Sequence, residues 1–439
     1  MLLPRIGQFR SAARQTRIRK SVIAASAAIL LFGPTAAVAN AQPDPAPQLP
    51  PELITAITRD LKISPQEYLH RADVAQQVAA FGTTAQRQYP QVFAGSWLDD
   101  AGKAVVALAQ GPGSDEARKA AQSAGFEVRN VAKSEMTLRG EKSAFEQWLS
   151  GQPAEVASQV RGAVIDTVNN TVAVRVDKSG LPMPSFIDPA RVIVMPAPPQ
   201  AGEPIAAAIA SASNLGPKAA GDSYASLMGR LQLRCSLGFN GTLNGSTVNI
   251  SAGHCNPDLP SAGGDNAAAV VALVTDNSGP RVGQFQKSVL GQQDYSIIKI
   301  NDEFRDSFSN NLVRVPNAAP IALGGVAVPV VGAPVCKSGA RTGFSCGVIN
   351  AVDQTVQIGD RQQTQSFSAN ICALPGDSGG PVVTGNLALG ISSASSVADY
   401  PICEIPNLIG ALTGNVPQLF AQPLNVVLSD NPGLKVNGS

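Results

Sequence analysis

Hydrophobic and polar positions in the first half of the chain alternate between helical and strand-like patterns. Ser64, Pro65 and Glu67 supply an N-cap, a first-turn proline and a capping-box acid, which predict the start of a helix. Residues 92–98 and 103–108 are apolar runs on either side of Asp-Asp-Ala-Gly, a pattern that predicts a β-hairpin. The other predicted elements of this half are a helix over 114–124 and short strands over 126–128 and 171–176.

The second half is dominated by strand patterns. Residues 237–250 form a β-rich run, and residues 294–300 predict a mostly buried strand that opens on Asp294. The apolar stretch 321–335 is interrupted by glycine and proline, which favours strands over a membrane anchor. Between the halves, residues 177–220 are rich in proline and alanine and are interpreted as a linker.

The amino-terminal segment has the pattern of an export signal. Basic residues precede an apolar run over about 22–32, among them Arg10, Arg14, Arg17, Arg19 and Lys20. Ala-Asn-Ala at 39–41 offers a small-x-small cleavage site. The run is too short to span a membrane as a helix. The first cysteine is Cys235, so lipid anchoring at a lipobox is not expected. We therefore interpret residues 1–41 as a signal peptide.

Composition narrows the possible partners and cofactors. The chain has 439 residues and a formal net charge of +1, and no basic cluster beyond the amino terminus suggests nucleic-acid binding. All six cysteines follow residue 230, and an even number in an exported chain favours disulfides, although many pairings are possible. Zinc is disfavoured because C-x-x-C pairs are missing and only His254 is nearby. We expect no metal and no other cofactor.

Candidate chemistry centres on Gly-Asp-Ser-Gly-Gly-Pro at residues 376–381. A serine hydroxyl is a poor nucleophile unless a base accepts its proton and backbone N–H groups receive the oxyanion. Glycines on both sides of Ser378 allow a tight turn that aims such N–H groups into one place. Without partner residues the same motif would be a glycine-rich surface loop.

Histidine is scarce, which limits the choice of base. The chain has only His70 and His254, and His254 alone lies near the half that holds Ser378. It follows the β-rich run and sits between small residues and a cysteine, which suits an imidazole fixed at a strand end. Asp294, at the start of a buried strand, is the best acid to orient that imidazole.

These segments together resemble a known family. Residues 251–255, the Asp294 strand and residues 372–381 are similar to the chymotrypsin-like serine proteases, and more narrowly to the bacterial streptogrisins and α-lytic protease. Residues 234–240 and the 336–347 hairpin match the same branch. The resemblance covers roughly residues 220 to 439. It implies an all-β fold of two six-stranded antiparallel β-barrels with the active site in the cleft between them.

The resemblance also implies disulfides and domains. It selects the pairs Cys235–Cys255, Cys336–Cys346 and Cys372–Cys403. Residues 221–439 would be the protease domain, with a mature form that begins near residues 219–222. Residues 42–176 would be the α+β pro-region, which assists folding and inhibits the enzyme until it is removed. A substrate-binding or cell-wall module is the alternative for that segment.

Site roles carry over residue by residue. Ser378 would be the nucleophile, His254 the base and Asp294 its orienting acid, with the N–H groups of Gly376 and Ser378 as the oxyanion hole. Substrate-binding residues are expected to be Asn370, near the base of the pocket, and Ser393, Ala394 and Ser395 along the substrate strand. Ser393 would also reinforce Asp294. The pocket has no acid that would select Lys or Arg and no extra histidine that would select Glu, so an apolar or small residue before the cut is expected.

One position departs from the family pattern. In the bacterial branch the acid before the serine, here Asp377, pairs with an internal arginine, but this chain has Lys337 at that place. Lysine cannot form the planar two-pronged bond that arginine makes to a carboxylate, so we expect Lys337 to act as a point charge. The prediction is a secreted, extracellular bacterial endopeptidase that acts as a monomer on peptides or proteins and contacts no membrane after signal cleavage. A catalytically silent binding protein and a self-processing surface protein remain the alternatives.

Overall fold

The computed structural model describes residues 49–195, 203–210, 215–274 and 277–439. The proposed signal peptide, residues 1–41, lies outside these ranges, as do two parts of the proposed linker. None of the helices in the described ranges is long and apolar enough to cross a membrane.

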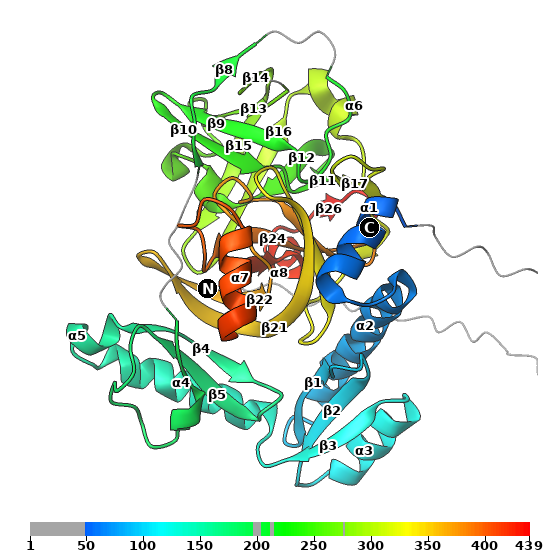
Figure 1. Ribbon diagram of the computed structural model, residues 1–439, viewed down its shortest axis with the longest axis vertical. Helices are drawn as coiled ribbons and strands as arrows, with labels where there is room; N and C mark the ends of the chain where they lie inside the picture. The colour runs from blue at the N-terminus through cyan, green and yellow to red at the C-terminus, as the bar shows by residue number, and fades with distance from the viewer. Residues whose placement is uncertain (1–48, 196–202, 211–214, 275–276) are drawn as a thin grey trace, which may run out of the picture. The chain divides into compact units, whose positions relative to one another are not determined.

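The first large sheet carries the strands that lead to His254 and Asp294. Its strands follow the order β26-β11-β12-β16-β15-β13-β9-β10-β7 (Figure 1). From that order their bounds are Leu434–Val436, Phe239–Leu243, Ser246–Ser251, Asp294–Ile300, Arg281–Leu290, Ala269–Ala272, Ser223–Met228, Leu231–Ser236 and Glu203–Pro204. Fully buried side chains such as Tyr224, Phe239, Ile250 and Ile298 fill its interior. Burying these side chains is the main stabilisation of the sheet.

The second large sheet contains a closed ring of six strands. The order is β20-β23-β24-β25-β22-β21, and β20 pairs again with β21 to complete the barrel. In that order the bounds are Pro334–Gly339, Pro381–Thr384, Leu387–Ser395, Leu419–Pro423, Arg361–Ala369 and Gly343–Ile358. Val335, Phe367, Val382 and Leu389 are fully buried in its core. The all-β fold class expected for this half of the chain is confirmed.

The first part of the proposed pro-region contains the elements that the sequence predicts there. Helix α2 (Pro65–Gln88) begins after Ser64, whose Oγ accepts a hydrogen bond of 3.1 Å from the Glu67 N–H. Strands β1 (Phe93–Leu98) and β2 (Ala104–Ala109) form the predicted hairpin. Strand β3 (Glu127–Val131) pairs with β2 in parallel, which the intervening helix α3 (Ser114–Ser123) makes possible.

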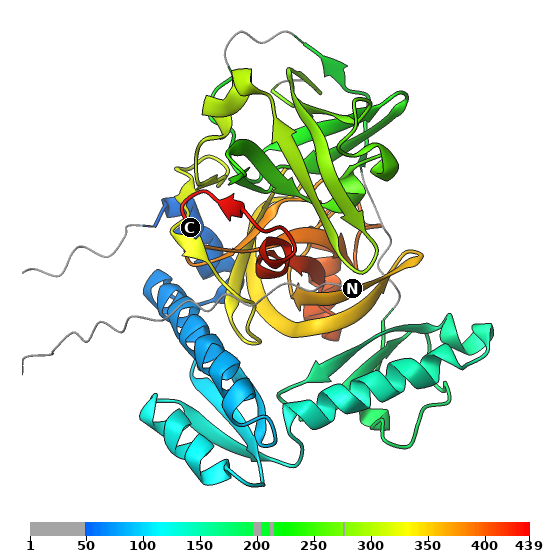
Figure 2. The ribbon, with the colours of Figure 1, turned by 180° about the vertical axis from the view of Figure 1, so that it is seen from behind.

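The second part of this region extends the closed barrel. Strand β4 (Val160–Asp166) pairs with β21, and β5 (Thr171–Val176) and β6 (Val192–Val194) follow in the same sheet. Helix α4 (Glu135–Ser150) lies along β4 and β5 (Figure 2). Its Phe145 is buried in one hydrophobic cluster with Val172 of β5. The proposed pro-region and the barrel therefore share a continuous sheet.

The proposed linker is more structured than its composition suggests. It contains β6, β7 and β8 (Ala208–Ile209), and β8 pairs with β14 (Ser278–Gly279). Ala219 and Ala220, near the expected start of the mature form, are buried. The N–H of Ala220 donates to the carbonyl of Leu312 at 2.8 Å. These two residues are thus integrated into the part of the chain proposed to be the protease domain.

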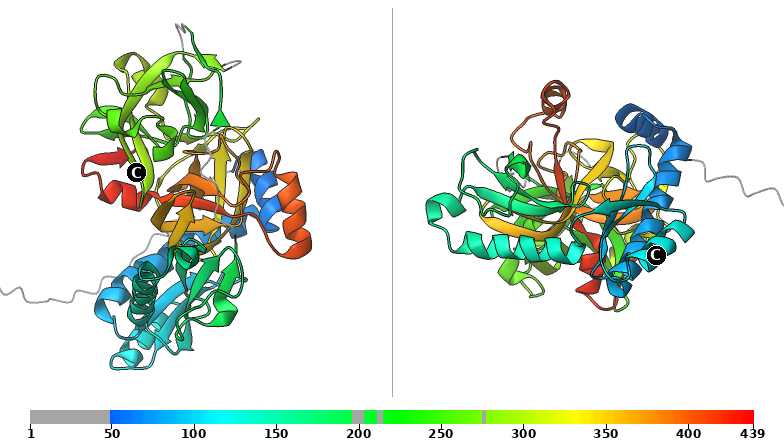
Figure 3. Two further views of the ribbon diagram at one scale, coloured as in Figure 1. Left: turned by 90° about the vertical axis from the view of Figure 1, so that its left-hand side faces the viewer. Right: turned by 90° about the horizontal axis from the view of Figure 1, so that it is seen from below.

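All three disulfides implied by the family resemblance are present: Cys235–Cys255, Cys336–Cys346 and Cys372–Cys403. The third bond anchors the start of helix α7 (Glu404–Thr413), which projects from the barrel in both views of Figure 3. The first and third bonds tie down the segments on either side of the proposed active site.

Candidate active site

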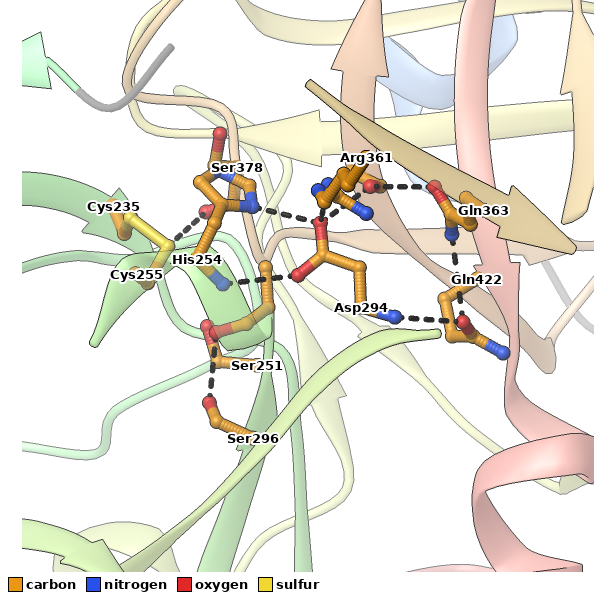
Figure 4. Close-up of polar contacts among 12 residues, drawn as sticks. Cys235, Ser251, His254, Cys255, Asp294, Ser296, Arg361, Gln363, Ser378 and Gln422 are labelled. Carbon is orange, nitrogen blue, oxygen red and sulfur yellow. Dashed lines mark hydrogen bonds and ion pairs between the residues drawn. A yellow bond between two sulfur atoms is a disulfide. The ribbon is translucent and has the colours of Figure 1, made fainter. Parts of the chain in front are cut away.

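His254 is held on Asp294 by two hydrogen bonds. It lies in a short 3-10 turn, Gly253–Cys255, directly after β12. Its Nδ1 is 2.8 Å from Oδ2 of Asp294, and its own backbone N–H donates to Oδ1 at 3.0 Å (Figure 4). Both side chains are almost fully buried. The aspartate therefore fixes both the position of the imidazole and the proton on Nδ1.

Asp294 opens β16 and faces several donors besides His254. Ser393 Oγ donates to Oδ2 at 2.5 Å, and Nη2 of Arg361 lies 2.9 Å from the same oxygen. Burial alone would raise the pKa of this carboxyl, but the charges and hydrogen bonds of His254, Arg361 and Ser393 hold the pKa of Asp294 well below its usual range. The acid is therefore ionised whenever the enzyme is folded near neutral pH.

Ser378 lies in the tight loop that precedes β23. Gly376 and Gly379 have φ values of 104° and 83°, a region of backbone space that glycine enters without strain. The Ser378 carbonyl accepts a bond of 2.8 Å from the Ser236 N–H and lies 3.8 Å from Sγ of Cys255. Since Cys255 follows His254 directly, these contacts bring the serine loop beside the histidine (Figure 4).

The remaining backbone of this loop is used to hold its shape. The N–H groups of Asp377, Gly379 and Gly380 donate to the carbonyls of Leu374, Ser392 and Asp377 at distances of 3.0, 2.8 and 3.0 Å. The Ser236 hydroxyl donates to the Gly376 carbonyl at 2.8 Å. A turn fixed at so many points can present an N–H group to a substrate oxygen without reorganising.

The carboxylate of Asp377 is buried and reaches Lys337 through a threonine. Nζ of Lys337 is 3.5 Å from Oδ2 of Asp377, and both side chains are fully buried. Lys337 donates at 2.5 Å to Oγ1 of Thr342, which donates at 2.6 Å to the same carboxylate oxygen. The N–H groups of Arg341 and Thr342 bind Oδ1 at 3.0 and 2.9 Å. The cluster thus combines one charge with several donors in place of a guanidinium fork.

A small cavity of about 20 Å³ opens beside Ser378. Ser393, Ala394 and Ser395, three of the predicted substrate-binding residues, line it. Asn370 does not line it, because its Oδ1 accepts a hydrogen bond from the Val348 N–H and the residue is exposed. The other lining residues are Ala373, Leu374, Pro375, Asp377, Ser378, Ser392, Ala398 and Leu419. Most of the lining side chains are alanine, serine, proline or leucine, and none of them is cationic, so the cavity offers little room and no positive charge to a substrate side chain.

Known proteins resemble this part of the chain. Residues 220–413 match the family described as Trypsin. Glutamyl endopeptidase 2 of Streptomyces griseus is 31% identical over 163 residues, which cover 37% of this chain and 79% of that protein. The chain belongs to the trypsin family of serine proteases. The mostly β-stranded second half of the chain and its three disulfides agree with that membership.

Two other known proteins are similar to part of this chain. Streptogrisin-C of Streptomyces griseus is 30% identical over 163 residues, or 37% of this chain, and the chain spans only 32% of the length of that relative. The solved structure of Thermobifida fusca Protease A aligns at 26% identity with a TM-score of 0.38 and covers 50% of this chain and 98% of that chain. Residues 42–176, the proposed pro-region of this trypsin-family chain, lie outside the family match at residues 220–413.

Sequence reasoning missed several residues of the site. Arg361 and Gln363 come from β22, and Gln422 from β25 accepts the Asp294 N–H at 3.0 Å. Gln363 accepts a hydrogen bond from Ser393 rather than contacting Asp294 directly. No motif marks the three residues, because only the pairing of the closed barrel brings them to this place. Within the described residues, no group of three or more His, Cys, Asp or Glu side chains is arranged to hold a metal ion.

Proposed function

We propose that this trypsin-family chain is a secreted bacterial serine endopeptidase that is made as a pro-enzyme and cleaves after small or apolar residues. The hydrogen-bonded pair of His254 and Asp294 beside the Ser378 loop is the observation that carries the proposal. The other ring nitrogen of His254, Nε2, makes no hydrogen bond within the described part of the chain. It is therefore available to exchange a proton with the serine and the leaving group.

The reaction follows from these positions. Ser378 Oγ attacks the peptide carbonyl while His254 accepts its proton, and the N–H groups of Gly376 and Ser378 receive the oxyanion. His254 then delivers the proton to the leaving amine, which departs and leaves an ester on Ser378. Water hydrolyses that ester with His254 again as the base. Asp294 stabilises the imidazolium at each stage because it stays ionised.

The cavity supports a preference for a small, uncharged residue before the cut. Its volume of about 20 Å³ is near that of a single water site, so a large side chain would need the walls to move. One relative is named a glutamyl endopeptidase, a name that denotes cleavage after Glu. In this chain, however, no histidine, lysine or arginine lines the cavity. A carboxylate would have no cationic partner there.

Contacts of residues 49–176 with the barrel support a pro-region that assists folding. Asp60 Oδ2 accepts a bond of 2.8 Å from the Cys346 N–H, and Tyr68 accepts one of 2.9 Å from the Gly385 N–H. The Gln76 side-chain amide donates to the Val328 carbonyl at 3.1 Å and accepts from the Val328 N–H at 3.0 Å. A template that satisfies barrel edges in this way lowers the cost of pairing strands far apart in sequence.

Replacing the nucleophile tests the proposed chemistry. Ser378→Ala should lower turnover of peptide substrates by on the order of a million-fold, because nucleophile and base act as a unit. Ser309→Ala, which alters an exposed serine of the same domain, is the matched control and should retain activity. A fluorophosphonate reagent should label the wild-type protein at residue 378 and leave the Ser378→Ala variant unlabelled.

The same two measurements separate the alternatives. A catalytically silent binding protein would resist labelling and cleave no peptide in the wild-type form. A protein that acts only on itself would be labelled and processed but would not cleave added peptides. Ser378→Ala protein that still cleaved peptides well would refute the assignment of the nucleophile.

A further inference from the structure

Strand β7 lies beside the proposed active site. Glu203 and Pro204 pair in antiparallel fashion with Arg234 and Leu233 on the outer edge of β10. In the order of the sheet β7 is the last strand, so without it this edge of β10 would be open. β10 contains Cys235, whose disulfide partner directly follows His254. Extended peptides commonly bind proteases and other proteins by adding a strand to such an edge.

The carboxylate of Glu203 lies between two arginines of the protease domain. Oε2 is 3.5 Å from Nη1 of Arg234, and Oε1 is 3.3 Å from Nη1 of Arg341. Arg234 also donates to Oδ1 of Asn277, and the N–H of Arg341 is fixed on Asp377. The guanidinium of Arg234 and the backbone of Arg341 are thus held by the protease domain itself, and the two side chains form a site of positive charge that suits one carboxylate.

Glu203 also reaches the loop that holds the proposed nucleophile. A Cβ placed on Gly376 would lie 2.7 Å from Oε2 of Glu203 and 3.1 Å from the Cβ of Arg341. Neither arginine nor Gly376 lines the cavity beside Ser378, which Ser393, Ala394 and Ser395 border instead. The arginine pair and the cavity are therefore separate subsites that both adjoin the reacting serine.

We propose that Arg234 and Arg341 form a subsite for an acidic side chain on the leaving-group side of the cleaved peptide bond. In the precursor, Glu203 of the same chain fills it. The proposal rests on the endopeptidase function. Residues before the bond are assigned to the cavity lined by residues 393–395 of β24, whereas Glu203 pairs with β10 of the other sheet, so its subsite is assigned to a residue after the bond. The arginine pair would then add a preference for Asp or Glu after the bond to the preference for a small residue before it.

The register of β7 has a consequence for processing. If Glu203 occupies a position after the bond, the precursor is cut shortly before Glu203 and not near Ala219 and Ala220, which are buried. Hydrolysis of that bond consumes one water and leaves a carboxylate on the released part and an amine on the part that carries Glu203. The processed chain therefore keeps Glu203 among its first few residues.

Peptide substrates measure the preference directly. The processed wild-type enzyme is tested on three series of peptides, one for each of the first three positions after the bond. Within a series only that position differs, and it holds Glu, Gln or Lys. At one of these positions kcat/KM should be about fivefold to tenfold higher for Glu than for Gln, since two partly exposed ion pairs are involved. Lys at that position should be the poorest substrate. Equal rates for the three side chains at all three positions would overturn the proposal.

Variants assign the preference to the arginines. Arg341→Glu should reverse the preference in favour of Lys. Arg341→Gln removes the charge without reversing it and should reduce the preference for Glu to about twofold, so it serves as the second variant if Arg341→Glu folds poorly. Arg305→Glu changes an exposed arginine of the same domain and should leave the wild-type preference. A Glu preference that persists in both Arg341 variants would also overturn the proposal.

Self-processing gives an independent readout. Glu203→Gln in the full chain should slow the appearance of the processed form by about fivefold, whereas Glu155→Gln, at an exposed glutamate of α5 (Ala154–Ala157), should not. The intact mass of the wild-type product should place Glu203 near its amino terminus, and a product that begins after Glu203 would contradict the assigned register. Protein that is neither labelled at Ser378 nor active refutes the proposed function, while labelled, active protein without a Glu preference refutes only the subsite.

Discussion

Asp294 carries one negative charge, and His254 of the 3-10 turn, Arg361 of β22 and Tyr224 of β9 surround it. Tyr224 binds the hydroxyl of Ser251 at 3.0 Å, and burial raises the pKa of this phenol, so it stays neutral. Arg361 is permanently charged and lies 2.9 Å from the oxygen that also holds His254. The guanidinium and the imidazolium therefore compete for the same carboxylate.

Arg361→Gln should move the acidic limb of the pH profile of kcat/KM to higher pH, by about half a unit to one unit. Without the guanidinium, the full charge of Asp294 stabilises the protonated histidine, so the neutral base is reached only at higher pH. Arg361→Lys keeps the charge and should leave the limb near its wild-type position. A variant that lowers the plateau without moving the limb would indicate that Arg361 only supports the fold.

Lys337→Met should destabilise the domain by about 3–5 kcal/mol, because it leaves the buried carboxylate of Asp377 without a counter-charge. Urea unfolding is measured in Ser378→Ala protein so that self-cleavage does not interfere. Lys435→Met removes an exposed lysine of β26 and should change stability by less than about 0.5 kcal/mol. Unfolding midpoints and slopes that match the parent protein would show that Thr342 and the backbone donors hold Asp377 by themselves.

Residues with a local signature could be predicted from the sequence, and their supporting partners could not. Ser378 is marked by its glycines, and His254 by its rarity. The expected hydrogen bond from Ser393 to Asp294 is present at 2.5 Å. Arg361 and Thr342 carry no such mark, since each reaches its carboxylate through barrel pairing or a tight turn.

At the scale of elements, local patterns predicted the structure where capping or alternation decides it. The helix after Ser64, the hairpin of β1 and β2 and the strand β16 lie where the sequence predicts them. Strand β7 was missed within a presumed spacer because it is two residues long and exists only through pairing with β10. Composition cannot reveal such an element, since the hydrogen bonds that stabilise it come from a partner strand about thirty residues away in the sequence.

Pairing of β4 with β21 joins residues 160–166 to the barrel, and Gly162 is the residue that permits it. Gly162 has a φ of 147°, and a Cβ on it would lie 2.0 Å from the carbonyl oxygen of Thr355. A larger residue must separate the two strands or strain the backbone, which costs on the order of 1–3 kcal/mol. The register pairs Gly162 with Val356, so damage at this one position disturbs the junction of the two parts.

Gly162→Ala in the full chain should therefore lower the yield of processed, active enzyme several-fold, while the enzyme that is recovered keeps the wild-type kcat/KM. Yield falls because the template is impaired, and activity persists because the altered residue lies in the part proposed to be removed. Gly140→Ala in α4 meets no other atom within 4 Å and should give at least the wild-type yield. A normal yield from Gly162→Ala would mean that β4 does not assist barrel folding, and recovered enzyme with reduced kcat/KM would mean that this strand stays part of the working enzyme.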